Sequence, residues 1–369
     1  MRHLFFRRIA AAALLCLLLP FPGSSLAGGA WHSLSELQGS EYVLADQDAT
    51  CEVRMTFLGD CTLGGETSKR SSRLGFVRKI EEYGYEHPFR QLSLLTSADD
   101  LTVANLEVVL SDRDLKKVKK KYNFIGPTAY TGILTSGGID CVTIANNHTH
   151  DFGDEGYADT KAALDLAGVA WFGSDSPAVW ISDDGIMLGF IGVSYSLTGD
   201  RYKRYSQQYQ ALRDIGCSAV ITVMHAGTEY SYDPPDNYQK QIVDRAVGCG
   251  TDLIVGHHPH VVQGYTIQDG VPVIYSLGNC SFGGTTHAKD SDALVLQAVM
   301  SFENGALVKQ ELHFYPISIT GDSHYNDYSP VFLTGSDAER VLNKLLKSTG
   351  FDPGTFDETE GAVVTLYCN

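Results

Sequence analysis

The stretch Leu253-Ile-Val-Gly-His-His-Pro-His260 decides the fold of this chain. Its apolar run ends in glycine, a pattern typical of a short buried strand, and polar side chains begin as soon as the run ends. His258 and His260 flank Pro259, whose fixed φ and missing N–H stiffen the segment. Two imidazoles held in this way can reach one ion, or each of two adjacent ions. A lone His after a strand is usually structural or exposed, whereas this run favours a metal site; His257 either orients the loop or contacts a substrate.

The same pattern recurs along the chain. Five further apolar runs end in residues that bind metal ions or polarise phosphates, and these residues are Asp60, Glu107, Asn147 with His148, His225 and Asn279. Binding sites in α/β sheets form beyond the carboxyl ends of the strands. We therefore expect these side chains to gather with His258 and His260 in one shared site, although they are widely spread in the sequence.

Four of these residues have alternative explanations. Asp60 suits a bridging position between two cations, but an Asp at this place is also common as a helix cap or turn residue. Glu107 either supplies a second carboxylate or is a buried acid paired with a basic residue. The amide oxygen of Asn147 suits a hard cation, although Asn-Asn is also turn chemistry. Asn279 either closes the site or ends its strand in a turn.

Three residues are candidates for acid–base chemistry. His148 can serve as an acid or as an electrostatic stabiliser beside a metal-binding amide. Asp151 adds a carboxylate to this polar cluster, at a place where a strand should simply be ending. Glu229 follows His225, which fits a further metal ligand. Glu229 either holds an imidazole, acts as a general acid or base, or forms a surface salt bridge.

The composition is that of a globular protein with a sizeable core: 369 residues, 43% hydrophobic and 20% charged. The formal net charge of −16 argues against nucleic-acid binding, which needs a basic footprint. An acidic protein that handles an anionic substrate must neutralise it locally, and a metal cluster would do so. Lys116–Lys121 is the one dense basic run, and it is either a solvated loop or a loop that receives an anionic substrate.

Strand-like and helix-like segments alternate from Cys51 onward, which indicates the α/β class. One catalytic domain over residues 51–319 is the simplest division, with a polar lead-in over residues 28–50 and a C-terminal extension over residues 320–369 packed on the domain. Helices are expected at residues 70–83, 89–98, 153–167, 205–215, 237–247 and 337–347.

The first 27 residues have the pattern of a secretory signal peptide. Arginines precede an apolar stretch over residues 9–19, and small residues lead to Ala27. The stretch is short for a spanning helix, which needs about 20 residues, but an uncleaved membrane anchor is the alternative. We therefore expect an exported protein, extracellular or at the cell surface. Such a compartment permits disulfides, and Cys51 and Cys368, near the two ends of the folded part, are candidates for a staple.

Taken together, the motifs resemble the capsule-synthesis CapA family, also called poly-γ-glutamate biosynthesis proteins, within the metallophosphoesterase superfamily. They occur in the family's order, between about Arg54 and Phe282. The matching segments are Phe57-Leu-Gly-Asp60, Asn105-Leu-Glu107, Ala145-Asn-Asn-His148 with Asp151 and Gly153, Asp159-Thr160, His225–Tyr230, Gly256-His-His-Pro-His260 and Tyr275-Ser-Leu-Gly-Asn279.

This resemblance implies a four-layer α-β-β-α sandwich with two mixed sheets, a metallophosphoesterase-like fold with a divalent metal site at the shared edge of the sheets. In the superfamily the metals activate water and clamp a phosphoryl group. Glu107 stands where the superfamily has its bridging carboxylate, and His148 matches its catalytic His. Carried over residue by residue, the implied metal ligands are Asp60, Glu107, Asn147, His225, His258 and His260.

Two departures from the superfamily pattern affect the metal count. Thr62 stands where the Asp-x-His motif has its imidazole, and Asn105-Leu-Glu107 stands where an Asp normally follows Gly. The expected cofactor is therefore one or two divalent ions, for which manganese, iron and zinc all suit the donors.

The sequence leaves three functions open. The first is an exported, metal-dependent, phosphoesterase-like hydrolase that acts on an anionic polymer or phosphorylated substrate of the capsule or cell surface. The second is a non-catalytic or weakly catalytic accessory factor that binds the polymer or its membrane synthesis and export proteins. The third is a ligand-free domain whose strand-end polar residues only bond one another, which is costly for buried imidazoles.

Overall fold

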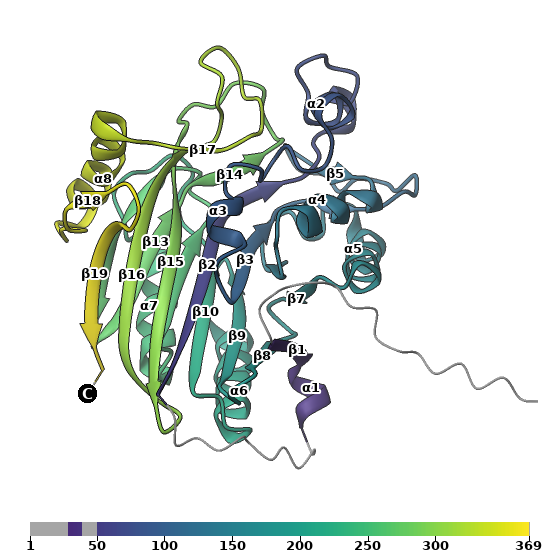
Figure 1. Ribbon diagram of the computed structural model, residues 1–369. Coiled ribbons are helices and arrows are strands. Elements are labelled where there is room, and N and C mark those ends of the chain that lie inside the picture. The colour runs from purple at the N-terminus through teal and green to yellow at the C-terminus, as the bar shows by residue number, and fades with distance from the viewer. Residues whose placement is uncertain (1–28, 39–49, 369) are drawn as a thin grey trace, which may run out of the picture.

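The computed structural model describes residues 29–38 and 50–368, so the predicted signal peptide lies outside the described residues. Two mixed β-sheets pack face to face (Figure 1). In the first sheet the central strands are parallel and the edge strands antiparallel. Its strands, in spatial order, are β1 (Gly29–Ser33), β8 (Ala178–Ser182), β9 (Met187–Ser194), β10 (Ala219–His225), β11 (Leu253–His257), β13 (Val271–Leu277) and β12 (Val262–Gln268).

The second sheet is parallel in one half and antiparallel in the other. Its strands, in spatial order, are β18 (Phe356–Asp357), β19 (Gly361–Tyr367), β16 (Ala306–Ser318), β15 (Asp292–Glu303), β2 (Thr50–Thr62), β3 (Leu101–Leu106), β6 (Cys141–Thr143) and β7 (Ala170–Phe172). Two short strands join it from the side, β14 (Asn279–Phe282) on β2 and β17 (Val331–Phe332) on β16. A separate small ladder pairs β4 (Val109–Leu110) with β5 (Ile125–Gly126).

Helices cover the outer face of each sheet. On the first sheet these are α1 (Leu34–Leu37), α6 (Gly199–Asp214) and α7 (Asn237–Cys249). On the second sheet they are α2 (Phe76–Tyr83), α3 (Ser93–Thr96), α4 (Thr131–Ser136) and α5 (Gly153–Ala167), with the short turns η1 (Thr67–Lys69) and η2 (Thr128–Tyr130). None of the helices in the described ranges is long and apolar enough to cross a bilayer. The predicted four-layer α-β-β-α sandwich with two mixed sheets is confirmed.

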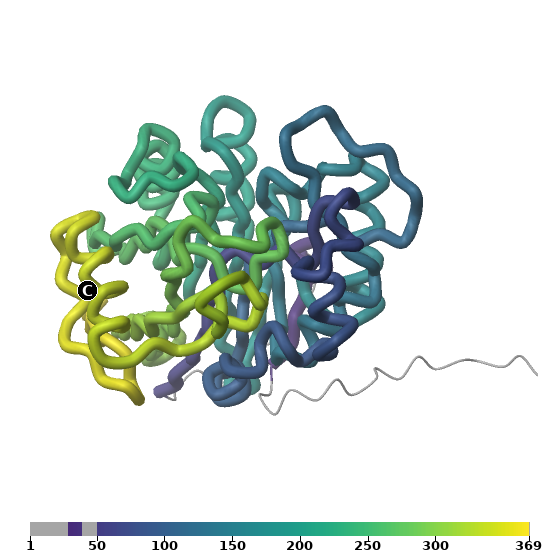
Figure 2. Tube along the Cα trace, turned by 90° about the horizontal axis from the view of Figure 1, so that it is seen from above, coloured from purple at the N-terminus to yellow at the C-terminus, as the bar shows by residue number. Residues whose placement is uncertain are grey.

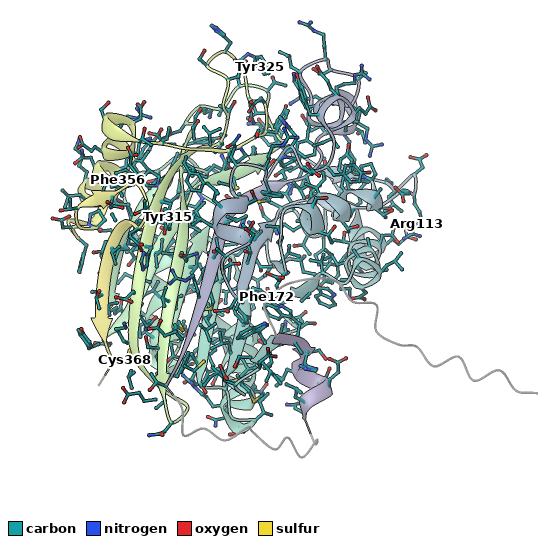
Figure 3. The ribbon with its side chains drawn as sticks, viewed as in Figure 1. Arg113, Phe172, Tyr315, Tyr325, Phe356 and Cys368 are labelled. Atoms are coloured by element: carbon teal, nitrogen blue, oxygen red, sulfur yellow. The ribbon has the colours of Figure 1, made fainter. Side chains whose placement is uncertain are left out.

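The side-chain alternation along β2 explains the layering. Successive strand residues point to opposite faces of a sheet. Met55 and Phe57 lie in the core between the sheets, whereas Leu58 and Cys61 lie in the core beneath the outer helices. Both sets are buried, because β2 is central in its sheet and covered on both sides. The inter-sheet core also holds Phe172 of β7 (Figure 3).

Residues 320–368 extend the second sheet and close one end of the inter-sheet core. β19 pairs antiparallel with β16, and α8 (Gly335–Thr349) inserts Val341 and Leu345 into the core. Seen from above, the yellow end of this segment, with α8 and β19, lies on the side of the molecule opposite α2 (Figure 2), whereas Tyr325 in the loop before β17 contacts Lys79 of α2. At the other end of the sequence, residues 29–37 form β1 and α1, and β1 is an edge strand of the first sheet.

The expected staple between Cys51 and Cys368 is wrong. Cys51 lies on β2, whereas Cys368 follows β19 at the far edge of the sheet (Figure 3), and β15 and β16 run between them. Three strand spacings amount to about 14 Å, well beyond the Cα separation of about 7 Å that a disulfide can span. All the described cysteines are free.

Strand register brings the polar strand ends to one edge. In the second sheet Asp60 on β2 is opposite Asn105 on β3, which is opposite Thr143 on β6. In the first sheet His225 on β10 is opposite His257 on β11. These strands are parallel within each sheet, so their carboxyl ends lie together and the residues that follow them converge.

Gly256 on β11 sets how closely this strand approaches its neighbour β13 in the first sheet. A Cβ at this position would lie 2.1 Å from the carbonyl oxygen of Tyr275 and 2.7 Å from that of Ile274. We expect Gly256→Ala to destabilise the fold by about 1–3 kcal/mol, because backbone atoms of a central strand cannot move aside cheaply. Denaturant unfolding measures the loss. Gly248→Ala, in helix α7 with open space around it, is the control and should stabilise by about 1 kcal/mol; equal values for the two variants would contradict the argument.

Candidate metal centre

Two groups of side chains at this shared edge are arranged to hold cations. Among the described residues, ligand atoms within 4.8 Å of one another come from Glu107, His225 and His258, and from Asp60, Glu107 and His260. Glu107 belongs to both groups. The second sheet supplies the carboxylates and the first sheet supplies the imidazoles, so the site lies between the two sheets.

Glu107 is the residue least satisfied by the protein itself. Its side chain is fully buried, and neither carboxylate oxygen has a hydrogen-bond partner among the described residues. Burial raises the pKa of Glu107 well above its usual range, and the neighbouring carboxylate of Asp60 raises it further. An unpartnered buried polar group costs roughly 1–3 kcal/mol. A divalent cation would satisfy both oxygens, and the surrounding nitrogen and oxygen donors suit manganese, iron or zinc.

Asp60 is held by its neighbours as an anion. Its Oδ1 accepts a hydrogen bond from the amide of Asn105 (2.7 Å) and its Oδ2 one from the backbone N–H of His258 (3.2 Å). Nδ1 of His260 lies 3.1 Å from the same Oδ2. Burial alone would raise the pKa of Asp60, but the hydrogen bond and charge of His260 hold it below its usual range. A buried carboxylate in this state is ready to bind a cation.

The loop after β11 presents its two imidazoles in a strained backbone. His258 has φ 100° and His260 has φ 58°, a region that residues other than glycine rarely adopt. Burial and the charge of His260 lower the pKa of His258 to about 4. Burial would also lower the pKa of His260, but the carboxylates of Glu107 and Asp60 raise it to about 9. The two imidazoles therefore differ in proton affinity. His258 is the neutral one, whose ring nitrogen can bind a metal ion.

His225 and Asn147 complete the cluster from opposite sheets. Nε2 of His225 lies 2.9 Å from Oδ1 of Asn147, 3.1 Å from Nδ1 of His258 and 3.5 Å from Oε1 of Glu107. Burial lowers the pKa of His225 well below its usual range, as does the neighbouring His258. All six residues predicted as metal ligands are thus brought together.

His148 lies beside the cluster and outside both ligand groups. Its Nε2 is 3.7 Å from Oε1 of Glu107, and its Nδ1 is 2.6 Å from Oδ2 of Asp151. Burial lowers the pKa of His148. Asp151 is fully buried, and its carboxylate also accepts hydrogen bonds from Lys120 (2.6 Å) and from the backbone N–H of Phe124 (2.7 Å). Asp151 therefore fixes the imidazole of His148 and does not itself reach the ligand cluster.

Four other residues discussed from the sequence have clear positions. Oδ1 of Asn279 lies 2.9 Å from Nδ1 of His260, so Asn279 borders the site. His257 is buried, with Nδ1 3.5 Å from Oδ1 of Asp60. Glu229 is exposed on the loop after β10, and its charge contributes to the raised pKa of Glu107. The hydroxyl of Thr62 donates to the backbone carbonyl of Glu107 (3.3 Å) and so holds the chain that carries this carboxylate.

Sequence reasoning gave no role to three residues that organise the site. The amide of Asn105 donates to Asp60 and lies 3.1 Å from Nδ1 of His225, so it links both sheets. Asn146 donates to Oδ1 of Asn105 and to a backbone carbonyl at the end of β3. Lys120 is the half-buried member of the basic run Lys116–Lys121, and it contacts Asp151 and Nδ1 of His148. The signals for the two Asn residues were their places in the Asn105-Leu-Glu107 and Asn-Asn-His motifs.

The segment that carries this cluster also identifies the family of the chain. Residues 54–283 match the family described as bacterial capsule synthesis protein PGA_cap, and the chain belongs to this family. The resemblance found in the sequence motifs is confirmed.

The chain is also similar to individual proteins. The chain is 26% identical over 325 residues to the capsule biosynthesis protein CapA of Bacillus anthracis, covering 81% of this chain and 74% of that protein. It is 28% identical over 320 residues to the PGA biosynthesis protein CapA of Bacillus subtilis (strain 168), covering 80% and 78%. Among solved structures it is similar to the calcineurin-like phosphoesterase YfkN from Bacillus subtilis, with a TM-score of 0.41 and 13% identity over 82% of this chain and 98% of that one.

Proposed function

We propose that this protein is an exported, metal-dependent hydrolase of the phosphoesterase type that acts in capsule or cell-surface polymer metabolism. The observation that carries the proposal is the buried carboxylate of Glu107, whose two oxygens have no hydrogen-bond partner among the described residues and face imidazoles from the opposite sheet. Stability alone does not account for such an arrangement, because an unpaired buried acid is costly.

The ions would be held by the six residues gathered at the sheet edge: Asp60, Glu107, Asn147, His225, His258 and His260. Divalent cations at such a position supply Lewis-acid activation of water and neutralise the charge of a phosphoryl group. The buried carboxylate of Asp60 and the neutral imidazoles of His225 and His258 are already in the protonation states that ligands need.

His148 is the residue placed to move a proton. Nδ1 of His148 is held by the carboxylate of Asp151, so its Nε2 faces the centre. In the neutral ring Nε2 would accept a proton, and once doubly protonated the ring would donate that proton to the departing oxygen of a substrate or stabilise charge on it. Asp151 acts through His148 by fixing this orientation, and Lys120 in turn holds Asp151. Glu229, exposed at the rim, is the remaining candidate for a general acid or base, since its charge reaches both Glu107 and His258.

The substrate would be an anionic polymer or a phosphorylated group attached to one. The named functions of the two CapA relatives, capsule biosynthesis and PGA biosynthesis, support this choice. Membrane proteins that synthesise or export the polymer are the proposed partners. The net charge of −16 supports a substrate other than nucleic acid and a need for local cations.

A second candidate function rests on Thr62. Its hydroxyl is engaged with the backbone of Glu107, so this position offers the centre no imidazole. A centre with one fewer donor can bind an anionic polymer without cleaving it, as an accessory factor for synthesis or export would.

Hydrolysis assays separate the two functions. The full chain, stripped with a chelator and then reloaded with manganese or zinc, is expected to hydrolyse an aryl phosphate monoester or diester only after reloading. Stoichiometric metal content without any turnover, together with binding of the polymer, would favour the accessory function. Full activity in the stripped protein would overturn the proposed chemistry.

A further inference from the structure

A cavity of about 520 Å³ opens beside the metal centre, between helices α5 and α6. Its floor is formed by the carboxyl end of β9 and by the loop that follows β6, the same loop that carries Asn147 and His148. The volume is in the range of pockets that bind small molecules or one segment of a longer chain. None of the six proposed metal ligands lines it, so the cavity is a separate compartment with a shared wall.

The shared wall consists of Asn146, Ser194 and Tyr195. Ser194 is in register with His225 on the neighbouring strand, and the backbone N–H of Tyr195 donates to the carbonyl of His225 (3.1 Å). Tyr195 has φ 68°, a backbone conformation that is unusual for a tyrosine. The cavity therefore adjoins the metal centre along this strand end, through Ser194 and the backbone of Tyr195.

The cavity offers positive charge that the protein does not neutralise. Lys161 on α5 lies over the rings of Tyr157 (4.4 Å) and Trp171 (5.4 Å), and Arg201 on α6 lies over the ring of Tyr195 (5.8 Å). In the described part of the chain neither cation forms an ion pair. In a chain of net charge −16, two unpaired cations facing one cavity mark a place for an anion.

The other charged groups of the lining lie in two close pairs, of which only one joins two fixed charges. Arg204 pairs with Asp175, and Nδ1 of His150 lies 3.3 Å from Asp154. All four of these side chains are largely exposed to solvent. With His150 neutral, the lining holds the three cations Lys161, Arg201 and Arg204 and the two carboxylates Asp154 and Asp175, so its formal charge is positive.

Two polar atoms of the lining are buried and lack a hydrogen-bond partner. These are Oγ of Ser194 and Oε1 of Gln208. The Ser194 hydroxyl can donate to an anionic oxygen, whereas Gln208 uses its amide N–H to donate to the carbonyl of Ser174 (3.1 Å). Unpartnered buried polar atoms are rare in folded proteins. Of the two, only the Ser194 hydroxyl can be satisfied by an anionic ligand, because Oε1 of Gln208 is itself an acceptor.

We propose that this cavity is a binding subsite for a polyanionic segment of the substrate, held by Lys161, Arg201 and the hydroxyl of Ser194 next to the metal centre. The subsite deepens the proposed function, on which its description as a substrate site rests. The anionic groups are carboxylates or phosphates, since guanidinium and ammonium groups bind both. Such a subsite positions a long chain so that one of its linkages lies at the centre.

Binding to the full chain in the presence of a chelator tests the subsite without turnover or metal. The probes are a short γ-linked glutamate oligomer, as the carboxylate source, and tripolyphosphate, as the phosphate source, each titrated by calorimetry. Lys161→Gln and Arg201→Gln are each expected to weaken binding of the preferred probe roughly tenfold, because each removes one charge-assisted contact. Lys203→Gln, on the same helix as Arg201 but outside the cavity, should bind as the wild type does.

Ser194→Ala separates a binding role from a structural one. Its hydroxyl makes no bond within the described protein, so the variant should keep the wild-type melting temperature while its affinity for the probe falls. The better of the two probes identifies the anionic group. The subsite would be overturned if neither probe bound, or if the wild type and all three cavity variants bound the probe with equal affinity. Binding that persists in a protein without hydrolase activity would overturn only the proposed reaction.

Discussion

Replacing Glu107 with glutamine is expected to abolish the stabilisation that divalent metal gives to this protein. Glu107 is the one residue common to both ligand groups, so its loss removes a donor from each. A ligand at 100 times its Kd stabilises the native state by about 2.7 kcal/mol. The melting temperature of the wild-type protein should therefore rise when the metal is added. Thermal unfolding of the two proteins with and without manganese or zinc measures the difference.

A second part of this prediction concerns the stability of the metal-free protein. Burial and Asp60 raise the pKa of Glu107 well above its usual range, which favours the protonated acid, and glutamine has nearly the same shape as that acid. Glu107→Gln should therefore lie within about 1 kcal/mol of the wild type in chelator, a difference typical of a near-neutral substitution. Glu303→Gln, an exposed carboxylate at the end of β15, should retain the full metal response. Equal metal stabilisation in Glu107→Gln and the wild type would refute a shared bridging carboxylate.

Replacing His148 with alanine is expected to lower the hydrolytic rate by about 10²–10⁴-fold, the usual contribution of a general acid or base. Metal content should not change, because His148 belongs to neither ligand group. Steady-state kinetics and metal analysis of the same preparation separate the two effects. His324→Ala, an exposed imidazole on a distant loop, is the control.

The residues behind His148 should give graded losses. Asp151→Asn keeps the shape of the side chain but removes the charge that orients the imidazole, and Lys120→Gln removes the group that holds Asp151. Partners of this kind typically contribute about 10–100-fold, which should appear in kcat with little change in KM. Lys119→Gln, exposed in the same basic run, should have no effect. A fall in metal content in the His148 variant would instead make this residue a ligand.

Much of the fold followed from local pattern, and the errors have local causes. The helix expected at residues 153–167 has those bounds in α5, because it begins at a glycine and ends at Gly168, which adopts φ 70°. The helix expected at residues 70–83 begins only at Phe76, since Gly75 caps it and the preceding residues form turns. The segment 89–98 holds one short helix, α3, where tertiary packing rather than periodicity sets the backbone. Sequence periodicity carries no information about such packing.

The sequence predicted which residues lie in the candidate site, but not which contacts hold them there. Each predicted ligand follows an apolar run, and parallel register then fixes where it lies. Lys120 could not be found in this way, because its contact with Asp151 depends on how a long loop folds back across 31 positions. Nor could Ser194, which ends β9 without any neighbouring polar motif, although the sheet register places it beside His225.

The division of donors between the two sheets has a mechanical consequence. Carboxylates from β2 and the end of β3 face imidazoles from β10 and the end of β11. A cation bound by both sets would therefore cross-link the two sheets at this edge. Away from this rim, hydrogen bonds such as that from Gln310 to the carbonyl of Asp252 join the two sheets. Without the cation, the two oxygens of Glu107 would face imidazoles of the other sheet with no hydrogen bond, and local opening of the sandwich would begin there. Metal supply would then govern how long the folded chain survives proteases, independently of any reaction it catalyses.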